Sequence, residues 1–419
     1  MASCCARHKC SKGVTCQAAH GQLNYCYCSA AAGHGQCFEA GAPERYVGIL
    51  ERTMPIVMIR DPELIKLITV KDFDHFVDHR EFFGEDVFNK VTEEVDVDDL
   101  MRRYANDVIA STAFGIEVNS VVDKTNEFYE TGQKLSNFSV WMRIKILITH
   151  AFPALAKKLK LQAFSEKTTN FFRGLVKNTM EYREQNKVER PDMIQLLMQA
   201  AKEWNPDELV GQAFIFFMAG FETSASVLVM TVHELSLNPE VQATLYEEIK
   251  QFGDVKKALI YDILQNMKYL DMVINETFRK WSPAIIMDRV CLKPYDLPPS
   301  RPGANPYTVE PGQVVYNMVN CIHMDEKYYP EPHRFDPERF SEENKNNIKP
   351  FTFMPFGMGP RNCIGARFAL LEVKVLLYHL ILNFEILKCQ RTSEPLRLQP
   401  TDFQIKALGG TWVKLRKRY

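Results

Sequence analysis

A glycine-rich loop around one cysteine holds the most reactive combination of side chains in the sequence. Residues 356–365 are Phe-Gly-Met-Gly-Pro-Arg-Asn-Cys-Ile-Gly, and they lead directly into a helix predicted from Arg367. A cysteine just before a helix meets the positive end of the helix dipole and several free backbone N–H groups, and both favour its thiolate form. The glycines let a flat partner approach the backbone. Phe356 can cover the sulfur and Arg361 can reach a carboxylate of that partner.

This loop resembles the haem-binding loop of the cytochrome P450 family. The family's pattern, Phe-x-x-Gly-x-Arg-x-Cys-x-Gly, is complete from Phe356 to Gly365. The resemblance implies that Cys363 is the thiolate ligand of the iron in haem b, and that Arg361 pairs with a haem propionate. Phe356 and Gly365 would then lie beside the cofactor. A buried cysteine in an ordinary turn is the alternative, but chance would very seldom place these residues at these spacings.

Two further motifs of the family occur in order upstream of the cysteine. Glu276-Thr-Phe-Arg279 matches Glu-x-x-Arg, and its i, i+3 spacing puts both charges on one face of a predicted helix. Pro337-Glu-Arg339-Phe340 matches the segment that supplies a second arginine. The resemblance implies a Glu276–Arg279–Arg339 network. Its role would be structural, because it would hold the chain that supports the cysteine loop.

The long helix predicted at residues 209–237 carries the family's oxygen-binding sequence, Ala219-Gly-Phe-Glu-Thr223. The resemblance implies that Gly220 leaves room for dioxygen against the helix wall. Thr223 would turn its hydroxyl out of the backbone ladder and donate to bound oxygen, and Glu222 would relay protons from water. Taken alone, the segment is more typical of a kinked core helix. Its position in the series of motifs favours the functional interpretation.

Three basic residues outside these motifs have weaker assignments. Arg289 follows Asp288 where family members supply a second propionate-binding arginine, so we expect it in the haem site. Lys374 and Arg367 lie beyond the cysteine. They either help to dock an acidic partner surface or are simply solvated.

The resemblance runs from about residue 46 to the C-terminus and is closest to insect microsomal members of the detoxifying branch. It implies a mainly α fold with small β-sheets in one large domain. The implied activity inserts one oxygen atom from dioxygen into a small apolar compound, either a xenobiotic or an endogenous lipophile. Electrons would come from NADPH through NADPH–cytochrome P450 reductase. The expected location is the cytoplasmic face of the endoplasmic reticulum membrane.

The sequence departs from the family's pattern in three places. Residues 1–45 are rich in Cys, Ala and Gly, stand where members have an apolar anchor, and are expected to be disordered. No tryptophan lies soon after residues 82–89, since the four tryptophans stand at positions 141, 204, 281 and 412, so we expect the Trp-x-x-x-Arg helix that contacts the haem propionates to be absent near residue 90. The loop between Ile249 and Leu264 is short. We therefore expect the domain of residues 46–419 to be incomplete.

These departures leave three alternatives. The first is a catalytically dead, truncated product that binds no haem. The second is a relative that rearranges peroxides, which the intact Glu222–Thr223 pair disfavours. The third is a zinc-binding module at residues 1–37, where seven cysteines lie among three histidines, joined to a catalytic remnant.

The composition is that of a globular protein and excludes other classes. The 419 residues are 46% hydrophobic and 25% charged, which is enough for a large core. The net charge of −1 provides no basic field for nucleic acid. No apolar run reaches the ~20 residues of a membrane span, and residues 213–221 are expected in a core helix. The basic amphipathic stretch 153–164 is either a solvated face or a membrane-facing surface.

Helical periodicity dominates residues 91–280, and prolines interrupt helices after Trp281. The other expected elements are helices at 193–201, 267–274 and 367–382, a hairpin at 309–315 around Pro311-Gly312, and a strand-like tail at 403–415.

Overall fold

The computed structural model describes residues 25–27, 46–51, 54–59, 93–136, 140–159, 161, 164–200, 205–252, 261–399 and 405–418. The chain divides into two compact units, Met1–Phe88 and Asn89–Tyr419. The described strands of the first unit are β1 (Tyr25–Tyr27), β2 (Tyr46–Glu51) and β3 (Met54–Ile59). They form one sheet, in which β2 pairs parallel with β1 and antiparallel with β3.

Several predictions fall mostly outside the described residues. They are the zinc module and disorder at residues 1–45, the domain boundary after residue 45, the missing helix near residue 90, and the shortened loop, of which 253–260 is not described. These stay predictions.

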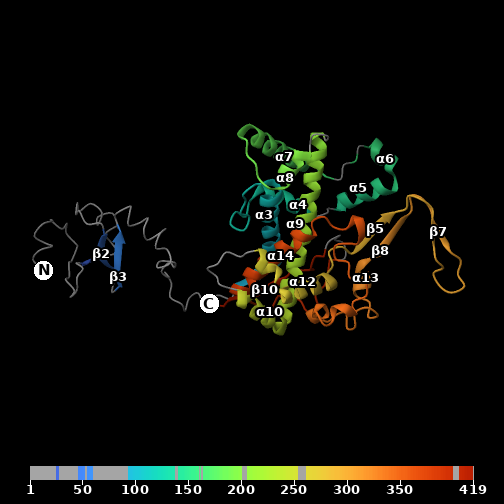
Figure 1. Ribbon diagram of the computed structural model, residues 1–419. Helices are drawn as coiled ribbons and strands as arrows, with labels where there is room; N and C mark the ends of the chain where they lie inside the picture. Colours follow the sequence, from blue (N-terminus) through green and yellow to red (C-terminus); the bar gives the residue numbers. More distant parts are fainter. Residues whose placement is uncertain are drawn as a thin grey trace, which may run out of the picture. The chain divides into compact units, whose positions relative to one another are not determined.

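The second unit is organised around helix α9 (Pro206–Leu237), which runs through the middle of Figure 1. Asn205 and Glu208 form a reciprocal capping box at its start, and Pro206 occupies the first turn, where its missing N–H costs nothing. Among the described residues, α9 is the one helix long and apolar enough to cross a membrane, yet 61% of its most apolar window is buried. It therefore serves as the core helix, as the sequence predicts for residues 213–221.

The helices packed around α9 form two groups. One group contains α3 (Val97–Ile109), the π-helical turn η4 (Ala110–Phe114), α4 (Glu127–Ser136), α5 (Val140–Ala151), α6 (Pro153–Lys158), α7 (Glu166–Asn186) and α8 (Met193–Ala200). The other contains α10 (Pro239–Phe252), α11 (Tyr261–Gln265), α12 (Lys268–Lys280), α13 (Val319–His323) and α14 (Ala366–Asn383). The buried apolar side chains form two clusters, and α9 and α3 contribute to both. The predicted helices at 193–201 and 367–382 are confirmed within two residues.

Small antiparallel sheets complete the second unit. Strands β4 (Glu93–Asp96), β10 (Trp412–Lys417) and β9 (Phe384–Leu387) form one sheet with β10 in the centre. Two further pairs, β5 (Ile286–Val290) with β8 (Val314–Met318) and β6 (Tyr295–Leu297) with β7 (Tyr307–Val309), form one long ribbon that projects from the unit (Figure 1). The fold is therefore mainly helical with small sheets, as expected.

The predicted hairpin at residues 309–315 is wrong. The strands on either side of it, β7 and β8, pair with β6 and β5 and not with each other. The Pro311-Gly312 turn, with Gly312 at φ 89°, bends one strand of the ribbon instead of reversing it. Gly312 N–H donates to the Cys291 carbonyl at 2.8 Å, and Cys291 N–H donates to the Gln313 carbonyl at 2.8 Å, so the bend stays hydrogen-bonded to the opposite strand.

Both roles predicted for Lys374 are also wrong. Its side chain is 3% exposed, its Nζ lies 2.7 Å from a carboxylate oxygen of Asp271, and it donates to the Leu264 carbonyl at 3.1 Å. Lys374 thus joins α14 to α11 and α12 and is neither solvated nor available to a partner. The reason is that α14 is enclosed around most of its middle, so a side chain in the centre of the helix cannot reach the surface. Arg367 is exposed.

Replacing Lys374 tests its structural role. Lys374→Ala leaves the Leu264 carbonyl and Asp271 without their charged donor, so the free energy of unfolding in urea should fall by ~2 kcal/mol. Arg367→Ala, an exposed cation on the same helix, should change it by less than ~0.5 kcal/mol. Equal stabilities for the two variants would contradict this assignment.

Candidate functional site

The cysteine loop has a fixed backbone shape that only its glycines allow. Gly357 and Gly359 have φ of 76° and 77°, in the left-handed region. A Cβ on Gly357 would approach the Met287 sulfur to 3.1 Å. Cys363 N–H donates to the Phe356 carbonyl at 2.8 Å, and this bond closes the loop. The loop ends at Gly365, which immediately precedes α14.

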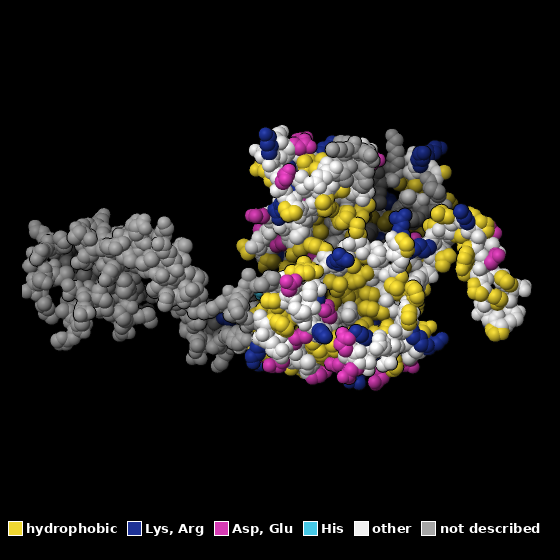
Figure 2. Space-filling model, in the orientation of Figure 1, with side chains coloured by type: hydrophobic (Ala, Val, Ile, Leu, Met, Phe, Trp, Pro, Cys, Tyr) yellow, Lys and Arg dark blue, Asp and Glu magenta, His cyan; other side chains and the backbone are white. Residues whose placement is uncertain are grey.

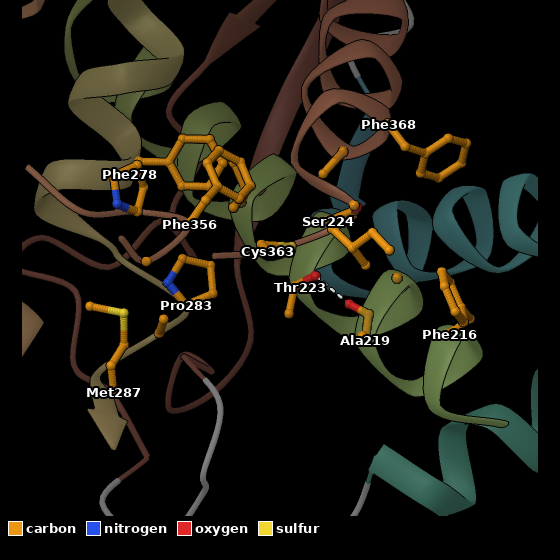
Figure 3. A pocket seen from close by; sticks show the side chains of 18 of the residues that line it. Phe216, Ala219, Thr223, Ser224, Phe278, Pro283, Met287, Phe356, Cys363 and Phe368 are labelled. Atoms are coloured by element: carbon orange, nitrogen blue, oxygen red, sulfur yellow. Dashed lines mark hydrogen bonds between the residues drawn. The ribbon is translucent and has the colours of Figure 1, made fainter. Parts of the chain in front are cut away.

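Cys363 opens onto a cavity of about 460 Å³ between α9, α14 and the start of β5. Figure 3 shows it between Phe356, whose ring packs edge-on against Phe278 at 4.9 Å between centroids, and the turn of α9 that carries Thr223 and Ser224. The cavity lining brings together most of the residues predicted from the sequence: Gly220, Thr223, Arg289, Phe356, Arg361, Cys363 and Gly365.

The cavity lining fits a flat, anionic, metal-bearing cofactor. The Cys363 side chain is exposed to the cavity, and a Cβ on Gly365 would stand 3.9 Å from its sulfur, where a flat ring would lie. Arg289 and Arg361 supply two guanidinium groups for carboxylates. Among the described residues, no three His, Cys, Asp or Glu side chains gather to hold a metal ion. A single thiolate can hold a metal here only if the cofactor supplies the other ligands, as haem does.

The Glu276–Arg279–Arg339 group lies under the loop and is almost completely buried. Arg279 donates from Nε and Nη2 to the two carboxylate oxygens of Glu276 at 2.7 and 2.8 Å. Its remaining donors reach the carbonyls of His323 and Pro332 at 3.0 and 2.8 Å. Arg339 Nε lies 3.5 Å from Glu276. One bidentate pair on α12 thus holds both the end of helix α13 and the irregular chain around Pro332.

His323 connects the buried Glu276–Arg279–Arg339 group to the cysteine loop. Burial, with a smaller contribution from the Arg279 charge, lowers the pKa of His323 to about 4. Its imidazole is therefore neutral at physiological pH, and Nε2 accepts a hydrogen bond of 3.0 Å from the backbone N–H of Met354. Met354 lies two residues before Phe356. No pattern in the sequence points to this histidine.

The polar residues of the α9 motif are placed on different sides of the helix. Thr223 lines the cavity, and its hydroxyl donates to the Ala219 carbonyl, as the dashed line in Figure 3 marks. Gly220 also lines the cavity, and Ile109 of α3 occupies the space beside it, since a Cβ on Gly220 would lie 2.9 Å from Ile109 Cδ1. Besides any role with dioxygen, the missing side chain lets α3 pack closely against α9.

Glu222 does not line this cavity. It is buried on another side of α9 and forms an ion pair with Arg102 of α3, which also contacts Asp98 at 3.2 Å. Both residues border a second cavity of about 420 Å³, whose lining includes the acidic residues Asp96, Asp98 and Asp99. A route from Glu222 to the first cavity would have to pass α9 itself. The sequence contains no signal for the Arg102 partnership.

Sequence reasoning missed two polar groups close to the cavity. Ser224 lines it, and Glu372 is buried on α14. One feature of the sequence could have pointed to Glu372. Its carboxylate lies inside the apolar run Ala369-Leu-Leu-Glu-Val373, where no solvent-exposed helix face is expected.

Comparisons with known proteins agree with this geometry. The family model for cytochrome P450 matches residues 80–412. Similar proteins include the probable cytochrome P450 9f2 of Drosophila melanogaster, 38% identical over 91% of this chain and 88% of the relative. Cytochrome P450 9e2 of Blattella germanica is 39% identical over 89% and 86%, and cytochrome P450 6k1 of the same species is 33% identical over 88% and 84%.

The alignments also reveal a difference in length. The first two run over 457 and 464 positions, more than the 419 residues of this chain, although they take in only 91% and 89% of it. The relatives therefore contain segments that have no counterpart here.

Removing Arg279 tests the support network. Arg279→Ala removes the bidentate partner of buried Glu276, which keeps Arg339 at 3.5 Å, and leaves two carbonyls without donors, so the free energy of unfolding should fall by ~3–5 kcal/mol. Arg334→Ala breaks only an exposed pair with Glu331 and should cost less than ~1 kcal/mol. Chemical denaturation followed by circular dichroism measures both, and similar losses would refute the network's importance.

Proposed function

The chain belongs to the cytochrome P450 family and is an oxidoreductase of that type, and from this we propose that it is a haem-thiolate monooxygenase acting on small lipophilic compounds. In this proposal Cys363 is the axial ligand of haem b. One oxygen atom of dioxygen enters the substrate and the other leaves as water. NADPH–cytochrome P450 reductase supplies the electrons.

The single observation that carries the proposal is the exposure of Cys363 to an apolar cavity with two arginines in its lining. Bound haem would supply the redox chemistry of dioxygen activation. Arg361 and Arg289 would hold its propionates, and Phe356 would shield the sulfur from water. Apolar side chains of the lining, among them Phe216, Ile286 and Met287, would bind a lipophilic substrate.

The residues of the α9 motif would bind oxygen and deliver protons. Thr223 has its hydroxyl at the cavity, bonded to the Ala219 carbonyl, and rotation about its side chain would release that hydroxyl to donate to oxygen. Gly220 leaves the cavity wall beside Thr223 without a side chain. Glu222 would take protons from water in the second cavity once its ion pair with Arg102 opens.

Haem retention decides between this activity and a catalytically dead product, because segments of the relatives have no counterpart in this chain. The purified protein, supplied with haem, reduced and placed under carbon monoxide, should show the strongly red-shifted Soret band of a thiolate-ligated haem. Cys363→Ala should abolish that band, whereas Cys321→Ala, another exposed cysteine, should leave it intact. Absence of haem absorbance in the unmodified chain would overturn the proposal.

Helices α5 and α6 support the proposed location at the endoplasmic reticulum membrane. Large apolar side chains at Trp141, Leu147, Phe152, Leu155 and Leu159 are exposed on and beside them. Lys157 and Lys158 end α6 among these side chains. An exposed apolar surface with adjacent lysines fits the interface of an anionic bilayer. Residues 160, 162 and 163 of the predicted basic stretch lie outside the described residues.

Flotation tests this surface. The chain should be recovered with liposomes containing anionic lipid, and the double variant Trp141→Ser, Leu155→Ser should lose most of that recovery because it removes buried contact area in the bilayer. Leu292→Ser, on the projecting ribbon and more exposed than either residue, should float like the unmodified chain. Undiminished flotation of the double variant would contradict the assignment.

A further inference from the structure

One face of α9 forms a wall of the cavity, and this wall has a gap at Gly220. The residues of this face follow one another at helical spacing, as Figure 3 shows for three of them: Phe216, Ala219, Gly220, Thr223 and Val227. Of these five residues, Gly220 alone has no side chain. Such a wall would leave a slot for a ligand at Gly220 unless another element filled it.

Ile109, the last residue of α3, fills this gap. A Cβ added to Gly220 would stand 2.9 Å from Ile109 Cδ1 and 3.5 Å from Ile109 Cγ1, so not even a methyl group fits between the two helices at this point. Ile109 is 5% exposed and itself lines the cavity. The end of one aliphatic side chain from a neighbouring helix therefore closes the wall that α9 leaves open.

Contacts on both sides of Ile109 hold it in place. Earlier on α3, Arg102 forms the ion pair with Glu222 of α9. Directly after Ile109, the π-helical turn η4 is held by Arg190, which donates to the Ser111 hydroxyl at 3.0 Å. The branched Cβ of an isoleucine also restricts rotation about χ1. The side chain can therefore act as a fixed stop for whatever occupies the cavity beside Gly220.

The surroundings of this stop suit an apolar ligand. Phe216 of α9 and Phe368 of α14 contribute aromatic rings to the lining, and Ile286 and Met287 of β5 add further apolar side chains. Figure 2 shows more apolar side chains on the face of the second unit between α9 and the projecting ribbon. Around Ile109 the site can therefore discriminate between apolar ligands by their shape.

We propose that Ile109 is a specificity-determining residue, which limits the width of the substrate beside Gly220 to slim apolar groups, either unbranched chains or planar rings. A branched group would have to displace Ile109 or disturb the packing of α3 against α9. The inference rests on the proposed monooxygenase function and specifies the shape of its lipophilic substrate. Since Thr223 lies on the same face of α9, the restriction applies to the part of the substrate that reacts.

A double-mutant cycle tests the contact without haem. Gly220→Ala places a methyl group against Ile109 Cδ1, whereas Ile109→Val removes that atom. The change in the urea midpoint of unfolding caused by Gly220→Ala should therefore be more destabilising in the unmodified chain than in the Ile109→Val background. Ile194→Val makes the same change in the same buried cluster but outside the cavity lining, and should not alter the effect. Equal effects of Gly220→Ala in all three backgrounds would overturn the proposal.

Two isomeric ligands test the restriction itself. n-Butylbenzene and tert-butylbenzene contain the same atoms and differ in the width of the alkyl group. In equilibrium dialysis against the haem-loaded chain, without turnover, the unmodified chain should prefer n-butylbenzene. Ile109→Ala opens the gap and should shift the ratio of the two dissociation constants toward tert-butylbenzene by about 10-fold. Ile194→Ala should leave the ratio unchanged.

The outcomes of the dialysis separate this inference from the proposed function. Ile109→Val, which removes less of the core and costs less stability, should shift the ratio in the same direction as Ile109→Ala. A normal carbon monoxide band with an unchanged ratio in both variants overturns only this inference. An unmodified chain without the band overturns the proposed function, and the double-mutant cycle still decides whether Ile109 closes the wall.

Discussion

The pair between Glu276 and Arg279 is the interaction on which the site depends. Both side chains are fully buried, so neither charge can return to water without unfolding the chain around it. Such a pair is stable only when every remaining donor and acceptor is satisfied. Here that condition ties down the carbonyls of His323 and Pro332 and the N–H of Asp336. The irregular chain after α13 has little secondary structure of its own, and this pair provides its anchor.

The buried Glu276–Arg279 pair also fixes the position of the cysteine loop. His323 is fixed through its carbonyl by Arg279 and holds the chain before Phe356 through its ring. The edge-on contact between Phe278 of α12 and Phe356 adds an apolar connection beside the polar one. A flat cofactor held through one thiolate would give the loop little template of its own. The protein must therefore fix the loop by itself, and it does so from a helix more than 80 residues upstream.

The sequence predicted the residues that meet at the cavity better than it predicted their partners. A motif identifies side chains whose chemistry requires particular residue types at particular spacings. For this reason the sequence predicted the loop from Phe356 to Gly365 and the α9 segment, together with the helices that carry them. Partners such as Arg102 and His323 act through ordinary packing and hydrogen bonds that leave no fixed spacing. The hairpin at 309–315 was mispredicted for a related reason: a Pro-Gly turn shows that the strand bends there, but which strand it pairs with depends on distant residues.

The two buried charges of α14 illustrate what a sequence pattern leaves undecided. Glu372 and Lys374 lie in one apolar run of α14, and of these two only Lys374 was predicted to be exposed. Lys374 reaches Asp271 at the edge of the core, and the two side chains lie 2.7 Å apart as an ion pair. The carboxyl oxygens of Glu372 have no hydrogen-bond partner, and burial raises the pKa of this group to about 8. The difference follows from what each side chain meets: Lys374 finds a carboxylate on α12, whereas the carboxyl group of Glu372 finds no charged partner.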